Sequence, residues 1–244
     1  MLIKITVITV CYNAEQTIRR TMKSVLDQSY TNIEYLIIDG KSTDNTLSIA
    51  ETIRQENKNR DIQIYCERDF GIYNAMNRGI VRASGDYVIF LNSGDLFCDN
   101  SVLERAAHMI RRYGYGIYYG IAYKVYKDRI IGKIDYGCDR RPDLIKLLNA
   151  FAPNHQATLA PLACMKKFYF DETYKYCADL DWIIRCYKHG IRLINMDYLV
   201  CRFDVSGISH RAGSIAEGKN DIYKMLKKNF PVLGRFAIFF IEIR

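Results

Sequence analysis

The stretch "IEYLIIDGKSTDNTLSIA" at residues 33–50 decides the fold, because it reads as a strand, a polar turn and the start of a helix. Its first six residues are mostly apolar and suit a strand, and Asp39 follows them directly. The letters GKS at 40–42 match the end of a phosphate-binding P-loop. That motif needs a glycine five positions before Gly40, and Tyr35 stands there. The turn is therefore not a P-loop, and the aspartate at the strand end needs another explanation.

Strand-like and helix-like segments alternate over the first part of the chain. The alternation favours a parallel sheet covered by helices on both faces. Right-handed crossovers place the carboxyl ends of such strands along one edge, where open α/β sheets bind ligands. Strands are predicted at 3–10, 33–38, 62–66 and 87–91, with helices that begin near Ile18, after Asp44 as the cap, and at Ile72.

A polar cluster follows each of these four predicted strands. Any one cluster is explained by an ordinary polar turn or a helix cap. The four together predict a site, because the topology brings all four strand ends to one edge. The clusters are Cys11 to Asn13, Asp39 to Ser42, Glu67 to Gly71, and Asn92 to Asp95.

Size and composition are those of a soluble globular chain with one large domain. The 244 residues are 49% apolar, and the net charge of +8 favours an anionic partner such as nucleic acid, an acidic membrane surface or a phosphorylated substrate. The eight cysteines include no C-x-x-C pair, so zinc and thioredoxin-like sites lack support and reduced thiols are expected. We expect no signal peptide and no bilayer-spanning segment, because no apolar run approaches the required ~20 residues.

The second half predicts further strands and helices without any internal repeat. Strands are predicted at 116–126 and 129–134 around a turn at 127–128, then at 155–160 and 192–203, with helices at 143–150 and 178–190.

The segment after residue 210 is basic and amphipathic. Such a helix can lie on an anionic membrane; the alternative is that it packs on the catalytic domain or on a second subunit. One helix face would carry Ile215, Ile222, Met225, Leu226 and Phe230, with charge from Lys219, Lys224, Lys227 and Lys228.

Several common enzyme motifs are absent from the sequence. No G-x-G-x-x-G follows the first strand, and neither H-E-x-x-H nor G-x-S-x-G occurs. With these motifs excluded, the features that suggest chemistry are the carboxylates at a nucleotide-sized cleft. Asp95 could hold Mg²⁺ or Mn²⁺, since these ions use one or two protein carboxylates with phosphate oxygens and waters. Such an ion would neutralise a departing diphosphate.

Two stretches carry a resemblance to a known family. These are "VITVCYNAEQTIRRTMKSVLDQSYTNIEYLIIDGKSTDNT" and "ERDFGIYNAMNRGIVRASGDYVIFLNSGD". Over roughly residues 3–210 the chain resembles the family 2 glycosyltransferases, above all bacterial enzymes that assemble capsule, O-antigen or exopolysaccharide repeat units. The resemblance implies an α/β GT-A fold: a Rossmann-like, mostly parallel central sheet flanked by helices, a smaller antiparallel sheet on the acceptor side, and a C-terminal helical segment. The expected division is a catalytic domain at 1–210, with nucleotide-sugar-binding (1–98) and acceptor-binding (99–210) halves, and the segment 211–244.

The resemblance also implies residues for the donor nucleotide and its metal. Asp95 matches the metal ligand that ends the family's D-x-D region. The sequence departs from the pattern, because residues 92–95 hold only one carboxylate, and Gly94 and Gly40 replace frequent aspartates. The residues expected around the nucleotide are Val10, Tyr12, Asn13, Asp39, Asp69, Gly71, Asn77 and Ser93.

A catalytic base is expected in "CADLDW". Asp179 aligns with the family's base, and Asp181 is the alternative. Residues two positions apart on a helix point in different directions, so one of the two can face the cleft while the other pairs with a partner such as Arg185. For both, an acidic helix start favoured by the macrodipole is the simpler explanation. One base and a metal suffice for a single inverting displacement, whereas a glycosidase needs two flanking carboxyls. By weaker resemblance, His155, Gln156, His210 and Arg211 lie near the acceptor and diphosphate.

The expected reaction is sugar transfer from a nucleotide-sugar, with uridine favoured by resemblance alone, to a glycan or lipid-linked glycan. The resemblance implies no nucleic-acid partner and a cytoplasmic site of action, at the inner face of the membrane if the tail binds there. Two alternatives stay open. A sugar nucleotidyltransferase would want a glycine-rich and basic loop that Cys11 to Glu15 does not supply, and a non-catalytic protein would bind nucleotide-sugar without turnover.

Overall fold

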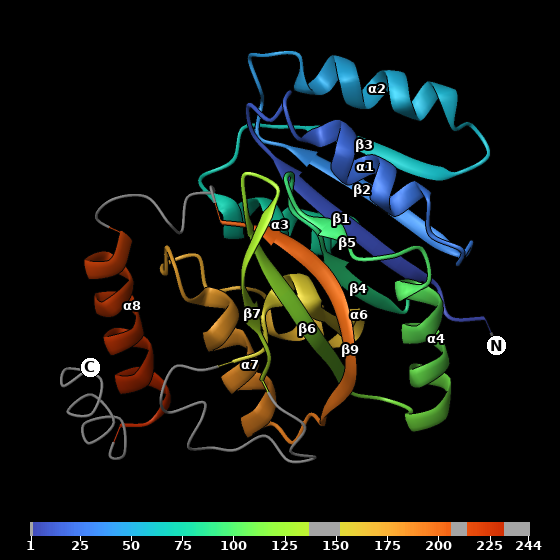
Figure 1. The fold of residues 1–244 in the computed structure, drawn as a ribbon. Helices are drawn as coiled ribbons and strands as arrows, with labels where there is room; N and C mark the ends of the chain where they lie inside the picture. The colour runs from blue at the N-terminus through green and yellow to red at the C-terminus, as the bar shows by residue number, and fades with distance from the viewer. Residues whose placement is uncertain (1, 137–151, 206–213, 232–244) are drawn as a thin grey trace.

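The computed structural model describes residues 2–136, 152–205 and 214–231, which form one α/β body around a single curled sheet (Figure 1). The strands are β1 (Ile5–Cys11), β2 (Ile33–Asp39), β3 (Asp61–Cys66), β4 (Tyr87–Phe90), β5 (Leu96–Phe97), β6 (Ile117–Tyr126), β7 (Arg129–Ile134), β8 (Thr158–Pro161) and β9 (Leu193–Asp204). The helices are α1 (Ile18–Leu26), α2 (Thr46–Glu56), α3 (Ile72–Arg82), α4 (Val102–Tyr113), η1 (His155–Ala157), α6 (Leu162–Phe168), α7 (Ala178–Lys188) and α8 (Ser214–Asn229).

The parallel half of the sheet is confirmed. Strands β3, β2, β1 and β4 lie side by side in that order, and each neighbouring pair runs parallel. Alternating side chains of the central strand enter opposite cores: Ile8 belongs to one buried cluster and Val7 to the other. A strand buried on both faces reads as a nearly continuous apolar run, which is why β1 is so hydrophobic.

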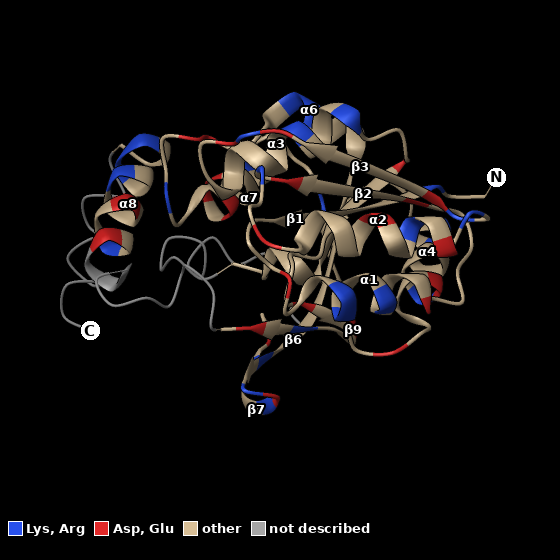
Figure 2. Ribbon diagram, turned by 90° about the horizontal axis from the view of Figure 1, so that it is seen from above, with Lys and Arg blue, Asp and Glu red and all other residues tan. Residues whose placement is uncertain are grey.

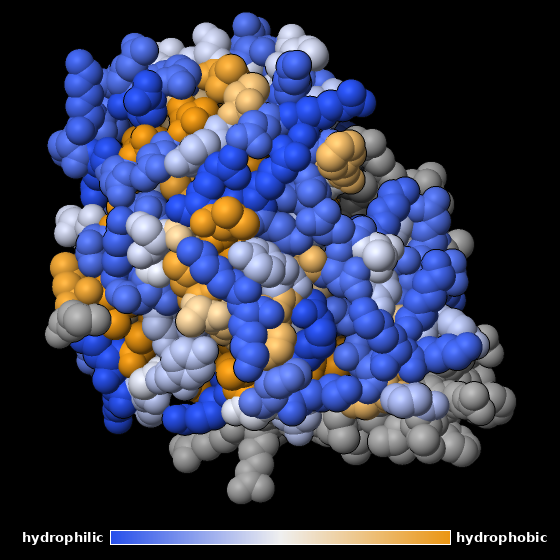
Figure 3. All heavy atoms as spheres, turned by 180° about the vertical axis from the view of Figure 1, so that it is seen from behind, coloured by the Kyte–Doolittle hydropathy of each residue, from blue (hydrophilic) through white to orange (hydrophobic). Residues whose placement is uncertain are grey.

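Helices cover both faces of this sheet, as expected (Figure 2). Helices α3, α6, α7 and α8 contribute to the cluster that contains Ile8, and α1, α2 and α4 to the cluster that contains Val7. Lys and Arg are spread over α1, α4, α6, α8 and the β7 hairpin (Figure 2). The side of the molecule seen in Figure 3 carries small apolar patches separated by hydrophilic side chains.

The antiparallel strands do not form the separate sheet that was expected. Strand β8 pairs antiparallel with both β4 and β6, so it joins the second half of the chain to the first in one nine-stranded sheet. Strands β6 and β9 pair parallel, and the β6–β7 hairpin turns at Lys127 and Asp128, both with positive φ. One sheet therefore carries both halves of the molecule.

One further strand begins later than expected, some elements were not predicted, and one predicted helix is not tested. The strand predicted at 155–160 begins with the 3-10 turn η1, where Asn154 accepts a hydrogen bond from Gln156 N–H, and β8 starts only at Thr158. Helices α4 and α6 and the short strand β5 were not predicted. The helix predicted at 143–150 lies outside the described residues.

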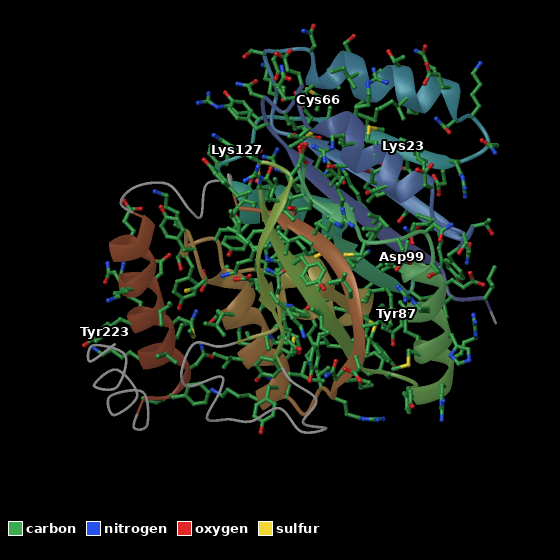
Figure 4. All side chains as sticks on the ribbon, in the orientation of Figure 1. Lys23, Cys66, Tyr87, Asp99, Lys127 and Tyr223 are labelled. Carbon is green, nitrogen blue, oxygen red and sulfur yellow. The ribbon has the colours of Figure 1, made fainter. Side chains whose placement is uncertain are left out.

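Helix α8 packs against the buried cluster that contains Ile8. Met225 and Leu226 are fully buried, and Ile222 and Phe230 pack against the same cluster. The side chain of Tyr223 points away from the sheet (Figure 4). The apolar side of this helix thus packs against the rest of the protein, as in the alternative to membrane contact. Within the described ranges, no helix combines the length and apolar content needed to cross a bilayer.

Candidate active site

The strand register brings the first three polar clusters together. Cys11, Asp39 and Cys66 are direct partners across β1, β2 and β3. The Cys66 Sγ lies 3.2 Å from Asp39 Oδ1, and the Cys11 Sγ lies 3.6 Å from Asp39 Oδ2 (Figure 4 labels Cys66). Burial raises the pKa of both thiols, and the Asp39 carboxylate raises it further. Both sulfurs therefore stay protonated and donate to Asp39.

The GKS turn is explained by Asp39 as well. The backbone N–H of Ser42 donates to Asp39 Oδ1 over 2.9 Å, and its hydroxyl donates to Asp39 Oδ2 over 2.5 Å. Asn13 then ties this turn to the loop after β1, because its N–H donates to Ser42 Oγ and its side-chain oxygen accepts from Thr43 N–H, both over 2.9 Å. The turn closes the end of β2 onto the end of β1. Asp44 accepts from Thr46 N–H over 3.0 Å, but the N-cap residue of α2 is Asn45 and not Asp44 as predicted.

Tyr12, Gly40 and Asp69 meet at the mouth of this cluster. A Cβ on Gly40 would lie 2.4 Å from Asp69 Oδ2 and 3.4 Å from a ring carbon of Tyr12, so a larger residue would force the Asp69 carboxylate to shift. The Asp69 carboxylate is oriented by the N–H of Gly71, which donates to Oδ1 over 3.0 Å. Tyr12 is 61% exposed. An exposed aromatic beside carboxylates is suited to stacking on a planar base.

The other residues expected at the nucleotide are dispersed. Val10 is buried at the end of β1, and its carbonyl accepts from Ser93 N–H. The Ser93 hydroxyl lies 2.9 Å from that of Thr17. Asn77 contacts the loop after α6: its Nδ2 donates to the Phe170 carbonyl over 2.9 Å, and its Oδ1 accepts from Phe170 N–H over 2.9 Å. The Asn77 side chain thus links α3 to this loop.

Asp95 is buried in the loop after β4. Its carboxylate is next to the end of β9, where Asp204 N–H donates to Oδ1 over 3.0 Å. Burial raises the pKa of Asp95 to about 7, although this N–H, the nearby His155 and a hydrogen bond from Gln156 oppose the rise. A carboxylate in this state is stabilised by a proton or by a cation.

The residues around Asp95 fit an oxygen-binding divalent ion. The side-chain oxygens of Asn92 and Gln156 are buried there without a hydrogen-bond partner. Carboxylate and amide oxygens are the ligands that Mg²⁺ prefers. The described part of the chain holds no group of three or more His, Cys, Asp or Glu side chains suited to a metal. Phosphate oxygens or waters would therefore have to complete the shell.

A pocket of about 370 Å³ adjoins this loop. Gly94 and Asp204 line its inner side, and the tip of the β6–β7 hairpin lines the outer side (Figure 4 labels Lys127). Asp128 at that tip pairs with Arg20 of α1 over 2.7 Å. The full lining is Thr17, Arg20, Gly94, Leu96, Val125, Lys127, Asp128, Ile130, Arg202 and Asp204.

Asp179 stands in the first turn of α7 and is the more accessible of the two candidate bases. Its side chain is 25% exposed, and His155 Nδ1 lies 2.8 Å from Oδ2. Oδ1 accepts from the Tyr73 hydroxyl over 3.1 Å and from Leu180 N–H over 2.9 Å. Burial raises the pKa of Asp179, but the His155 hydrogen bond and these other donors outweigh it, so the pKa is lowered. The carboxylate is ionised at neutral pH.

Asp181 is buried on the other side of α7 with no exposed surface. Arg185 Nε donates to Oδ2 over 2.6 Å, which is the pairing predicted four residues along the helix. The Asn229 side chain of α8 donates to Oδ1 over 2.7 Å. Its carboxylate therefore holds α7 and α8 together and contacts no solvent, which is the structural role expected for one of the two aspartates.

Two residues near these groups were missed. The Tyr73 phenol is kept protonated because burial and the Asp179 charge raise its pKa well above the usual range. No sequence signal marked it beyond its place in the first turn of a helix at the binding edge. Asp204 is the last residue of β9, as Asp39 is of β2, so the rule that polar residues mark strand ends would have found it. His210 and Arg211 lie outside the described residues.

Comparisons with known proteins agree on one family. Residues 6–172 match the family model "Glycosyl transferase family 2". An uncharacterised glycosyltransferase of Mycobacterium tuberculosis strain H37Rv is 30% identical over 245 residues, covering 95% of this chain and 87% of the relative. WfgD of Escherichia coli, named UDP-Glc:alpha-D-GlcNAc-diphosphoundecaprenol beta-1,3-glucosyltransferase, is 27% identical over 233 residues, covering 96% and 86%.

Solved structures share the fold. A segment of TarS from S. aureus, crystallised with UDP-GlcNAc, superposes with a TM-score of 0.75 at 20% identity, covering 93% of this chain and 65% of that segment. The mannosyltransferase PcManGT from Pyrobaculum calidifontis, in complex with GDP-Man and Mn2+, gives a TM-score of 0.69 at 17% identity, covering 93% and 64%. The chain thus spans just under two thirds of each of these crystallised proteins. On the family match, which includes all four strand-end clusters, this chain belongs to glycosyl transferase family 2.

Proposed function

We propose that this protein transfers a sugar from a nucleotide-sugar to a hydroxyl of a glycan acceptor, with inversion at the anomeric carbon. The observation that carries the proposal is the pair of aspartates on α7. Asp179 is ionised, accessible and held by three donors, whereas Asp181 is buried and paired. A single positioned carboxylate is what a one-step displacement needs as its base.

In this reaction Asp179 takes the proton of the acceptor hydroxyl. The acceptor oxygen forms its bond to the anomeric carbon as the bond to the diphosphate breaks, and the electron pair leaves with the diphosphate. A divalent ion, when bound at Asp95, would neutralise charge on that leaving group. The raised pKa of Asp95 and the unpartnered oxygens beside it support a cation there.

The donor base is placed between Tyr12, Asp39 and Asp69 in this proposal. The exposed Tyr12 ring would stack on the base, and the Asp69 carboxylate, which fills the space beside Gly40, would accept from a base or ribose donor. Uridine is the favoured nucleoside, as in the UDP-sugar named for WfgD and the UDP-GlcNAc bound to TarS. The donor sugar would point toward the pocket beside Gly94 and Asp204.

The acceptor is proposed to be a lipid-linked glycan of a bacterial surface polysaccharide. The name of WfgD specifies a diphosphoundecaprenol-linked acceptor, which supports this class. Residues 99–210 would form the acceptor half, opposite the nucleotide half at 1–98. The reaction would then take place at the cytoplasmic face of the membrane, with the +8 net charge favouring contact with anionic lipid.

A donor panel tests this function. The enzyme would be incubated with UDP-sugars, GDP-mannose and dTDP-rhamnose, with Mn²⁺, Mg²⁺ or EDTA, and nucleotide release measured. We expect one donor to be used, only with metal, and Asp95→Asn to lose metal dependence together with most of the rate. Nucleotide binding without release from any donor, even with a lipid-linked glycan acceptor present, would identify a non-catalytic binding protein instead.

A further inference from the structure

His155 connects the two acidic parts of the site. It begins the 3-10 turn η1 just before β8, and its side chain is 18% exposed. Nδ1 lies 2.8 Å from Asp179 Oδ2, on α7. Nε2 lies 3.3 Å from Asn92 Nδ2, in the loop that carries Asp95. The imidazole therefore contacts both Asp179, the proposed base, and the loop that carries Asp95.

The donors around Asp179 leave one direction open for a substrate. A carboxylate offers about four lone-pair positions on its two oxygens. Tyr73 and the N–H of Leu180 occupy Oδ1, and His155 occupies one position on Oδ2. Among the described residues no other donor to Asp179 is seen, which leaves the second position on Oδ2, and His155 decides which way this position faces.

We propose that His155 is a positioning residue of the transfer reaction, whose Nδ1–H holds Asp179 so that the free lone pair of Oδ2 meets the acceptor hydroxyl. The proposal rests on the proposed function, in which the acceptor proton moves to Asp179. The proton goes to Oδ2, the bond from acceptor oxygen to anomeric carbon forms, and the diphosphate leaves with the electrons of its bond. His155 itself neither gains nor loses a proton in this step.

The hydrogen bond also sets the protonation of Asp179. The titratable groups that face this pair are Tyr73 from α3, Cys177 just before α7, and Asp95 from the loop after β4, which itself faces Asp204 of β9. Of the described side chains around Asp179, His155 and Tyr73 donate hydrogen bonds to its carboxylate. Burial raises the pKa of Asp179, and the His155 hydrogen bond lowers it. Without that hydrogen bond the pKa of Asp179 would therefore rise.

Two substitutions separate the roles of the two ring nitrogens. In His155→Asn the amide nitrogen reaches the place of Nδ1 and can still donate to Asp179. In His155→Gln it reaches the place of Nε2 and cannot. We expect His155→Asn to keep most of the rate and His155→Gln to lose about 10- to 100-fold in kcat, as for a lost hydrogen bond to a charged group. His108→Gln on the exposed side of α4 is the matched control.

The kcat/KM profile supplies a second readout. Its acid limb should move to higher pH in His155→Gln, because Asp179 would need a higher pH to ionise. Independently of turnover, ¹³C NMR of labelled aspartate, with the Asp179 signal assigned from Asp179→Asn, should show a higher pKa in His155→Gln. An unchanged pKa in that titration would overturn the proposal, even in an enzyme for which no donor is found.

The outcomes distinguish this proposal from the function on which it rests. A larger loss in His155→Asn than in His155→Gln would mean that Nε2, and not the bond to Asp179, matters. Full activity in both would remove any role for the residue. If the His155 variants give either of these two results and Asp179→Asn is inactive, the proposed function stands and only the His155 proposal fails. If the wild type turns over no donor, the function fails, and the ¹³C titration alone judges His155.

Discussion

Asp181→Ala should lower the free energy of unfolding by about 3–5 kcal/mol, the range for breaking a buried ion pair by removing one partner. The substitution leaves the Arg185 guanidinium, which also donates to the carbonyls of Phe168 and Tyr169, without its buried counter-ion. It also removes the acceptor for the Asn229 side chain of α8. Urea unfolding followed by circular dichroism would measure the loss.

The control for Asp181 is an ion pair of the same spacing on a helix surface. Asp27 pairs with Lys23 four residues earlier over 3.0 Å, but both side chains are more than half exposed. Asp27→Ala should therefore change stability by no more than about 0.5 kcal/mol. A small stability loss in Asp181→Ala, with turnover abolished at temperatures where the protein is folded, would contradict the structural role and return Asp181 to the reaction.

Asp179→Asn should lower kcat by about 10²- to 10⁴-fold, the usual contribution of a general base. The amide oxygen can still accept from Tyr73 and Leu180, so the site keeps its shape and the donor dissociation constant should stay near the wild-type value. Steady-state kinetics and a nucleotide titration would measure the two quantities separately. A variant with lost donor binding and unchanged kcat would place Asp179 at the donor instead.

The control for Asp179 is the removal of a carboxylate away from the site. Glu51 on α2 pairs with Arg54 in an exposed contact, and Glu51→Gln should leave both kcat and donor binding unchanged. A near wild-type rate in Asp179→Asn would exclude this residue as the base, whatever the control shows.

The first half of the fold could be predicted because its pattern is local. Each parallel strand is a short apolar run with a polar residue at its end, and crossover topology places those ends together without knowledge of long-range contacts. Asp39 illustrates this: the sequence put it at the same edge as Cys11 and the cluster Glu67 to Gly71. The register pairs it with Cys11 and with Cys66, the residue just before that cluster. The pairing of Asp181 with Arg185 was equally local, since it follows from helical spacing.

The second half depends on contacts that spacing does not encode. Strand β8 joins β4 to β6, with Ile89 of β4 opposite Leu159 and Tyr118 of β6 opposite the same residue, so nothing local showed that the antiparallel strands continue the same sheet. The burial of Asp181 requires Asn229 from the end of α8, and the orientation of Asp179 requires Tyr73 and His155 from two other elements. The same applies to Asn77, whose direction is set by the loop at Phe170.

The anomeric configuration of the product tests the central claim most directly. The claim is a single displacement with one carboxylate base, and such a step must invert the configuration of the donor. With the donor identified by nucleotide release, ¹H NMR of the product formed on a glycan acceptor would report the coupling of the new anomeric proton. We predict a β-linked product from an α-linked donor. A retained α linkage would contradict the account, because it would require two displacements or a different reaction path.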